Sequence, residues 1–348
     1  MSTALEAASL IMIPTSYSDG LLASVKPNDG AGDFTFTRGS NTSATRVNAD
    51  GNIEKGYENL LKQSNTFSDA AWSGLFKTSG ILGYDGTNNA WEITKPSQPY
   101  TSIYQSVSAN GVWTFSLYAK ANTLDKISIR NQTDSEKADI DLLNGLITYT
   151  SSGIVHSDIE LISNDWYRLQ ITFSGSTSQI AIYVAWNNST AGSVYIQDAM
   201  LNQGMIAYPY VETTTAPVAA GILEDMPKID FFGGSQSLLL EPSRTNLMIN
   251  SEYPEGNQFF NNLNADYNAT TSPEGIQNAT RITATGTGAH QYGNYPVVSS
   301  GVGVVGSVFV KADATEYAQL FFGGGPASGS PYANFLLAIT QVLSKRET

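Results

Sequence analysis

The sequence predicts an all-β protein made of β-sandwich domains. The composition favours strands, because the chain has 31 Gly and 11% aromatic residues, is rich in Thr, Ser and Asn, and has few long runs of Leu, Glu, Lys and Ala. Several segments alternate apolar and polar residues with a period of two, which indicates strands with one buried face. A long internal repeat indicates that one β domain occurs twice, the second time incompletely.

The clearest alternation lies in residues 102–122. Asn110 and Gly111 accept positive φ at little cost, so we expect a strand, a turn at 109–111 and a second strand. The alternation of the second strand predicts which of its residues face the core. These are Trp113, Phe115, Leu117 and Ala119.

Short sequence segments of the first half of the chain recur in the second half in the same order. Residues 59–67 match 246–254, 90–94 match 279–283, 102–122 match 292–313, and 138–147 match 333–343. The period is about one domain, which is too long for a solenoid. The later strands of the first copy have no counterpart in the second. The second copy is therefore expected to have unpaired strand edges, which another chain or a further segment must cover to prevent aggregation.

These matches predict four parts of the chain. They are an N-terminal β element over residues 1–58, a complete domain over 59–215, a linker with short strands over 216–245, and a partial second copy over 246–348. A chain of 348 residues with 41% apolar residues is long enough for two domains with substantial cores.

Charge and cysteine content exclude several classes of function. The net charge is −13 and only 18 Lys and Arg are scattered along the chain, which argues against a nucleic-acid partner. The absence of Cys excludes disulfides, thiolate catalysis and Cys-based zinc sites. No apolar run approaches a membrane span, and the run at 10–13, which stops at Pro14, is too short for a signal core. We therefore expect neither membrane insertion nor Sec export.

Paired carboxylates raise the alternative of a glycoside hydrolase. Asp139 and Asp141, and likewise Asp158 and Glu160, occupy alternate positions that share one strand face, and glycoside hydrolysis uses two nearby carboxylates. Neighbours on an open strand face usually stay solvated, and no apolar pocket that could raise one pKa is indicated. The two histidines of the chain lie in different copies, which disfavours a Ser-His-Asp triad or a His-rich metal site. We predict that the chain is not an enzyme.

Three motifs resemble a recurrent architecture of bacteriophage structural proteins, often tail fibres or other virion appendages. They are residues 34–54 (FTFTRGSNTSATRVNADGNIE), 227–232 (PKIDFF) and 238–247 (LLLEPSRTNL). In that architecture the motifs usually lie close together and lead into a jelly-roll domain like those of carbohydrate-binding modules. Here a whole domain separates the first motif from the others. The end of that domain, residues 193–201 followed by 208–215, resembles the last strand and exit of such jelly rolls.

The resemblance implies tandem jelly-roll β-sandwich domains, the second copy incomplete, behind an N-terminal β element that serves for attachment. It implies a virion protein, such as a tail-fibre or appendage subunit, that binds host surface glycans. The implied partners are other virion proteins, host glycans and further copies of the chain, since phage fibres are commonly trimers. The alternative from another class is an assembly protein, such as a capsid decoration or tail adaptor, that binds no sugar. A polysaccharide depolymerase is a third possibility.

Outward-facing side chains supply the candidates for glycan binding. Residues 166–173 and 179–186 are predicted to be two strands separated by a turn at 175–178. Aromatic faces stack on sugar rings, whereas amides and guanidinium groups bind hydroxyls. The predicted glycan-binding residues are Tyr118, Trp166, Arg168, Gln170 and Tyr183. The alternative is that these aromatic residues simply cover a half-exposed sheet. A solvent-open face would favour glycan binding, and a face buried by a neighbouring subunit would favour assembly.

One acidic residue is a candidate for a structural metal site. Asp198 resembles, by its position in the last strand, an acidic residue that often helps to bind Ca²⁺ in similar jelly rolls. Calcium would also require oxygen ligands from other segments. The alternative is that Asp198 caps a backbone group or contacts water. No other cofactor is expected.

Overall fold

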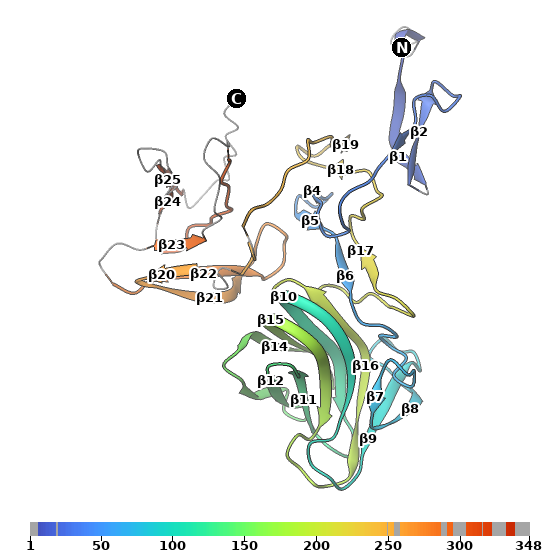
Figure 1. Ribbon diagram of the computed structural model, residues 1–348, viewed down its shortest axis with the longest axis vertical. Helices are drawn as coiled ribbons and strands as arrows, with labels where there is room; N and C mark the ends of the chain where they lie inside the picture. Colours follow the sequence, from blue (N-terminus) through green and yellow to red (C-terminus); the bar gives the residue numbers. More distant parts are fainter. Residues whose placement is uncertain are drawn as a thin grey trace. The chain divides into compact units, whose positions relative to one another are not determined.

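The computed structural model describes residues 6–18, 20–248, 250–253, 258–286, 291–294, 304–314, 316–321 and 332–337. Its secondary-structure elements are the strands β1 to β25 (Figure 1), so the predicted all-β fold is confirmed. The chain divides into two compact units, residues 1–245 with 250–293, and residues 246–249 with 294–348. In the described part of the chain, no helix is long and apolar enough to span a membrane.

The N-terminal region consists of short strands. β1 (Ile11–Ser18), β2 (Leu21–Lys26) and β3 (Phe34–Thr35) form a three-stranded sheet, and β4 (Thr45–Val47) pairs with β5 (Ile53–Lys55). A turn over residues 48–52 joins the last two strands, and Gly51 has a φ of 83° there. Short strands of this kind bury little apolar surface, so most of the core lies elsewhere in the chain.

The first two of the three motifs, residues 34–54 and 227–232, are far apart in sequence but meet in the structure. Asp230 lies in β18 (Ile229–Asp230), which pairs with β19 (Ser237–Leu238). The backbone N–H of Val47 donates to Asp230 Oδ1 at 2.8 Å, and the N–H of Phe231 donates to the carbonyl of Val47 at 3.0 Å. The jelly roll is thus an insertion between the two motifs. Insertion is sterically simple here because the entering strand β6 (Tyr57–Asn59) pairs with the leaving strand β17 (Val218–Ala220).

The inserted domain is built on one folded sheet. Its strand order is β13-β12-β11-β15-β10-β16-β9-β8, with β14 paired to β15 and β7 paired to β10 (Figure 1). The strands are β7 (Ser73–Gly74), β8 (Phe76–Ile81), β9 (Ala90–Lys95), β10 (Ser102–Ala121), β11 (Lys126–Asn131), β12 (Glu136–Asp141), β13 (Leu146–Thr150), β14 (Ile154–Ser163), β15 (Trp166–Val184) and β16 (Gly192–Gln203).

Two turns predicted within this domain are bends inside long strands. β10 and β15 run through both positions and stay paired, with Gly111 opposite Gly175. These two glycines have φ values of 104° and 122°, which residues with a Cβ rarely adopt. A register shift between Ser106 and Ala109 adds a bulge. The turn-forming residues therefore fold the sheet over on itself instead of reversing the chain, as at the corners of orthogonally packed sheets.

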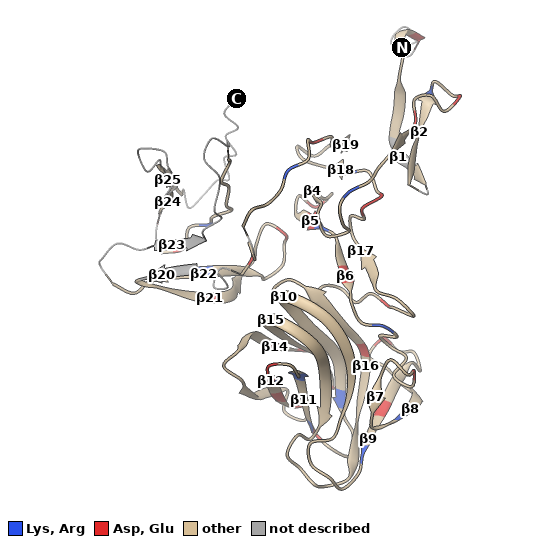
Figure 2. Cartoon of the chain, in the orientation of Figure 1, with Lys and Arg blue, Asp and Glu red and all other residues tan. Residues whose placement is uncertain are grey.

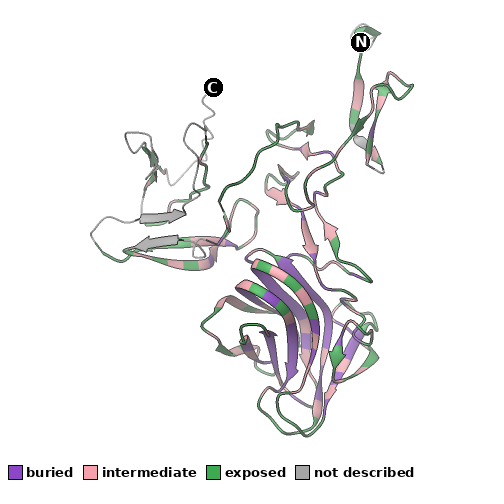
Figure 3. Ribbon diagram, viewed as in Figure 1, coloured by how far each residue is buried: buried purple, intermediate pink, exposed green. Residues whose placement is uncertain are grey.

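The core lies inside the folded sheet. Along β15 the inward residues are Leu169, Ile171 and Phe173 before the bend, and Ile180, Ile182 and Val184 after it. The alternation therefore changes phase between residues 173 and 180, across the bend at Gly175. Both sets belong to one hydrophobic cluster with the predicted inward residues of β10, which are Trp113, Phe115, Leu117 and Ala119. Buried residues follow these strands along their length (Figure 3).

The described residues of the second copy form two-stranded pairs. β20 (Gln258–Asn261) pairs with β23 (Gln291–Asn294), β21 (Leu263–Thr270) with β22 (Ala279–Ala284), and β24 (Tyr317–Phe321) with β25 (Tyr332–Leu336). The matched sequence segments fall on corresponding strands, since β22 corresponds to β9 and β25 corresponds to β12. Of the predicted counterpart of β10, residues 295–303 lie outside the described residues.

Candidate functional site

The structure does not bring the predicted glycan-binding residues to one place. Tyr118, Arg168 and Gln170 lie on the outer face of the sheet half that contains β14 and β16, whereas Tyr183 lies beyond the bend, beside β11. Arg168 and Tyr183 are fifteen residues apart along β15, which is about 50 Å of strand at about 3.3 Å per residue. The two groups belong to different surfaces, because both strands cross from one half to the other.

The first surface is covered by the chain itself. The segment 204–208, which directly follows β16, lies across this surface. The carbonyl of Met205 accepts a hydrogen bond from Thr172 Oγ1 at 3.1 Å. Gln170 Oε1 accepts the backbone N–H of Ala207 at 2.9 Å, and Arg168 donates to the carbonyl of Tyr208. The Arg168 and Gln170 side chains thus hold a chain segment in place. Both residues were predicted to bind a glycan, and in the structure each uses a polar group to bind residue 207 or 208.

Tyr118 and Trp166 are not presented to solvent as open platforms either. The Tyr84 ring stacks on the Tyr118 ring with centroids 3.8 Å apart and an interplanar angle of 14°. The Arg168 guanidinium lies 5.6 Å from the Tyr118 ring centroid. Trp166 was predicted to face outward, but its side chain is buried, since the outer face of this half is itself covered by other segments.

Asp198 lies under the same layer. It has a φ of 53°, and its Oδ2 accepts the Tyr84 hydroxyl at 2.8 Å. Burial raises the pKa of the Asp198 carboxyl to about 6. Within the described residues no group of three or more His, Cys, Asp or Glu side chains is arranged to hold a metal ion. The calcium site stays a prediction.

The second surface carries a cluster of aromatic and basic side chains around Tyr183. Strand pairing creates it, because Arg130 of β11 lies opposite Ala181 of β15 on one side and Lys137 of β12 on the other. Ile127 and Ile129, which precede Arg130 in β11, face the core, so the alternation along the strand directs the Arg130 side chain outward. We call this surface the Arg130 face. Its residues are Tyr100, Arg130, Gln132, Lys137, Tyr149, Tyr183 and Trp186.

Trp186 lies at the centre of the Arg130 face. Ala185, with a φ of 47°, turns the chain sharply after β15, and the backbone N–H of Tyr100 donates to the carbonyl of Trp186 at 2.9 Å. The Trp186 ring packs edge-to-face with Tyr183 at 4.5 Å and with Tyr100 at 5.1 Å. Tyr183 itself is buried, and its hydroxyl donates to Gln132 Oε1 at 3.1 Å. These contacts hold the half-buried indole in a defined orientation.

Two cations lie against these rings. Arg130 Cζ is 4.8 Å from the Trp186 ring centroid, and Lys137 Nζ is 4.7 Å from the centroids of both Trp186 and Tyr149. Each contact is a cation–π interaction worth about 0.5–2 kcal/mol. Lys137 also forms an ion pair with Asp139, which accepts a hydrogen bond from Ser128. Figure 2 shows where the charged residues lie on the strands of the sandwich, and Arg130 and Lys137 are neighbouring cations of β11 and β12.

The face offers exposed apolar surface at both sides of Trp186. Tyr100 is 54% exposed and Tyr149 is 51% exposed. Both rings contact the central cluster, Tyr100 through Trp186 and Tyr149 through Lys137. The result is a row of rings with a polar fringe, which can bind a ligand that has both flat apolar faces and hydrogen-bonding groups.

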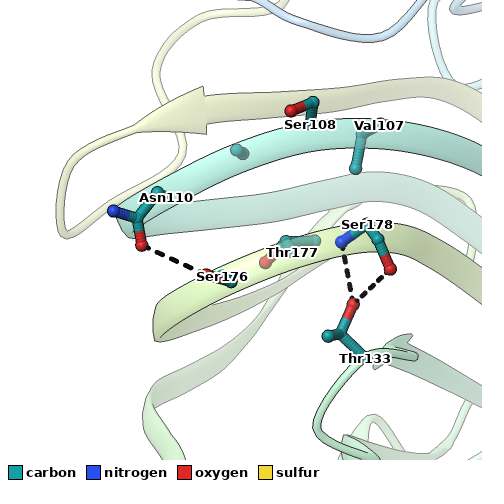
Figure 4. A pocket seen from close by; sticks show the side chains of 8 residues that line it. Val107, Ser108, Asn110, Thr133, Ser176, Thr177 and Ser178 are labelled. Atoms are coloured by element: carbon teal, nitrogen blue, oxygen red, sulfur yellow. Dashed lines mark hydrogen bonds between the residues drawn. The ribbon is translucent and has the colours of Figure 1, made fainter.

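An open polar depression lies at the bend of the sheet, next to the β11–β12 turn that carries Gln132. It is lined by Val107–Asn110 of β10, Ser176–Ser178 of β15, and Thr133 (Figure 4). Ser178 donates its backbone N–H to Thr133 Oγ1 at 2.8 Å, and Ser176 Oγ contacts Asn110 Oδ1 at 3.4 Å. Its lining has hydroxyl and amide groups but no charged or aromatic side chain. It is therefore a secondary feature beside the Arg130 face.

Of the residues of the Arg130 face, sequence reasoning identified only Tyr183. The alternation in β11 would have placed Arg130 outward. The information that was missing is the strand order, in which β11 and β12 pair beside β15 and bring Arg130 and Lys137 under Trp186. Pairing between strands distant in sequence has no local signature.

Comparison with known proteins gives likenesses of fold. No family model and no curated protein matches the chain. Similar solved structures include the CBM22-2 xylan-binding domain of Paenibacillus barcinonensis Xyn10C, with 10% identity, a TM-score of 0.28, and coverage of 42% of this chain and 98% of that one. The Clostridium thermocellum endo-1,4-β-D-xylanase 10B CBM22-1–GH10 structure, complexed with xylohexaose, has 12% identity and a TM-score of 0.26. The match covers 44% of this chain and 28% of that one. A CBM29-2 carbohydrate-binding module has 14% identity and a TM-score of 0.23, with coverage of 43% and 85%.

Proposed function

We propose that the domain formed by residues 59–215 binds glycans and that the ligand lies across the Arg130 face. The observation that carries the proposal is the row of exposed Tyr100, half-buried Trp186 and exposed Tyr149 on a rigid sheet, backed by Arg130 and Lys137. Sugar rings present flat C–H faces that stack on aromatic rings, and their hydroxyls need donors and acceptors at the edge of such a platform. Rings fixed by packing lose little entropy on binding.

The carboxylates near this face support binding without hydrolysis. A glycoside hydrolase needs one carboxyl group whose pKa is raised so that it can act as an acid. Asp139 is neutralised by its ion pair with Lys137. Hydrogen bonds from Lys126 and Asn144 lower the pKa of Asp141 to about 2. Asp158 accepts a hydrogen bond from Gln170 on the other surface. Neither Asp139 nor Asp141 is therefore set up as a general acid.

The test is binding of the purified full chain to an array of soluble and immobilised polysaccharides. We expect a Tyr100→Ala/Tyr149→Ala variant to bind its best ligand at least about tenfold more weakly, because each stacked ring contributes on the order of 1 kcal/mol. The matched control is Tyr317→Ala, which removes an exposed tyrosine from β24. Equal affinity of wild type and double variant would overturn the proposed site, and binding of no glycan would overturn the function.

We further propose that this binding serves a bacteriophage virion appendage, such as a tail fibre, assembled from several copies of the chain with other virion proteins. The proposal rests on the resemblance of residues 34–54, 227–232 and 238–247. It is supported by the hydrogen bonds through which the first two motifs form one element around Val47 and Asp230. Binding of labelled protein to susceptible but not resistant bacterial cells, lost in the Tyr100→Ala/Tyr149→Ala variant, is expected. Incorporation into virions without any binding to cells would favour the assembly role instead.

A further inference from the structure

Arg130 is a buried cation without a counter-ion in the described part of the chain. Its side chain is only 9% exposed, and none of its five N–H groups donates a hydrogen bond to another described residue. Its Nε is fully buried and has no partner. The contacts that it does make are with the Trp186 and Tyr183 rings, at 4.8 and 5.9 Å.

Such an arrangement costs stability. An unpaired buried charge loses hydration, and a cation–π contact returns only part of that loss. Arg168, in the other half of β15, also has a buried Nε without a partner, but its Nη2 donates to the carbonyl of Tyr208. Arg130 has no equivalent acceptor although the chain carries 31 Asp and Glu. The donors of Arg130 are therefore left available at a face where a ligand can reach them.

The neighbours of Arg130 indicate the charge of the ligand group that would pair with it. Lys137 lies directly opposite Arg130 in the β11–β12 pair, and the one carboxylate bound there, that of Asp139, is already paired with Lys137. Arg130, Lys137 and Asp139 together thus carry one positive charge in excess. A planar guanidinium fork matches a carboxylate with two parallel hydrogen bonds. The rings on either side select a group attached to a flat, partly apolar body.

We propose that the glycan bound by the Arg130 face is an acidic one, whose sugar carboxylate pairs with Arg130 while the sugar ring stacks on the Trp186 row. This inference rests on the proposed glycan-binding function and narrows its ligand to carboxylated sugars such as uronates. A neutral sugar would leave the Arg130 charge unpaired in the complex and more deeply buried than in the free protein. Binding a carboxylate removes that cost.

The experiment compares chemically matched ligands on the full-length protein. The probes are polygalacturonate, alginate and hyaluronate, each beside its fully methyl-esterified form, in which the same chain has lost its charge. We expect at least one carboxylated polymer to bind, with its ester binding about 10- to 100-fold more weakly, as the loss of a charge-assisted pair predicts. Arg130→Gln should reduce binding of the acid by a similar factor and leave binding of the ester unchanged. Raising the salt concentration should weaken binding of the acid alone.

Two controls separate charge from geometry. Arg281→Ala removes the same charge from an exposed ion pair in β22 and should leave binding unchanged. Arg130→Lys keeps the charge but not the planar fork, so it should recover only part of the affinity. Equal binding of acid and ester would overturn the acidic-ligand inference while leaving the proposed function standing. Failure to bind these probes and every neutral polysaccharide would overturn both.

Discussion

The two copies of the repeat place the same strands in the same register and bury them to very different extents. In the first copy Ile129 pairs with Ala138 and Ile127 with Ile140, and in the second Leu320 pairs with Ala333 and Ala318 with Phe335. Ile140 is 2% exposed, whereas its counterpart Phe335 is 48% exposed. Ile93 of β9 is 0% exposed, whereas Ile282 at the matching position of β22 is 38% exposed. The same local pattern thus forms a core in one copy and short hairpins in the other.

The difference follows from two strands. In the order β13-β12-β11-β15-β10-β16-β9-β8, β15 joins β11 to β10 and β16 joins β10 to β9. Removing both leaves β11 with β12 and β13, β10 with only the two-residue β7, and β9 with β8. The described strands of the second copy show two of these pairs, β24 with β25 and β22 with β21. A two-stranded hairpin is only marginally stable by itself. The later strands, and not the repeated ones, therefore complete the sandwich.

The strongest destabilisation is expected in β15, which has no counterpart among the described residues of the second copy. Ile171→Asp places an unpaired charge in the core, beside residues that are fully buried. We expect a loss of more than about 4 kcal/mol in the free energy of unfolding. All five tryptophans lie within residues 59–215, so urea unfolding followed by tryptophan fluorescence reports on the first copy alone. The control is Leu161→Asp at an exposed position of β14, which should change stability by less than about 0.5 kcal/mol.

A matched pair of substitutions tests the contrast in burial directly. Ile93→Ala should lower the free energy of unfolding by about 2–5 kcal/mol, because it leaves a cavity in the core. Ile282→Ala removes the same atoms from a half-exposed hairpin and should cost less than about 1 kcal/mol. Calorimetry of the two variants measures both. Equal costs would show that the second copy has a packed core in solution and that the comparison is wrong.

A smaller effect is a pH dependence of stability in the first copy. It arises from Asp198 in β16, a strand without a counterpart among the described residues of the second copy. Burial raises the pKa of its carboxyl to about 6 from an ordinary value of 3.8. The folded state therefore favours the protonated form, so the stability that Asp198 contributes is fully present below about pH 4 and is lost as the pH rises through about 6. Asp198→Asn stays neutral and retains an acceptor for Tyr84.

The stability of Asp198→Asn relative to wild type should therefore increase between pH 4 and pH 8, by up to about 3 kcal/mol. Urea unfolding followed by tryptophan fluorescence at a series of pH values measures this change. A stability difference that does not change with pH would contradict the buried, proton-binding state of Asp198. A change of opposite sign would indicate that a bound cation stabilises the carboxylate, as the predicted calcium site requires.

Composition and alternation by themselves determined the fold class and much of the core. The alternation in β10 identified Trp113, Phe115, Leu117 and Ala119 as inward residues, and all four belong to the core cluster. Alternation is a local property, since successive side chains of a strand point to opposite faces whatever the strand pairs with. The repeat was also recognisable from the sequence, and its matched segments fall on corresponding strands.

Only the tertiary structure decided where the chain bends and which surfaces are assembled. The Asn110–Gly111 signal marks a conformation with positive φ, which serves equally in a hairpin turn and in a bent strand, and the pairing of Gly111 with Gly175 selects the bend. That bend sends Arg168 and Tyr183 to different surfaces. The placement of Arg130 under Trp186 depends on β11 pairing with β15 across about fifty residues of sequence. Pairing between distant strands is determined by the packing of the whole domain, so no local pattern of residues records it.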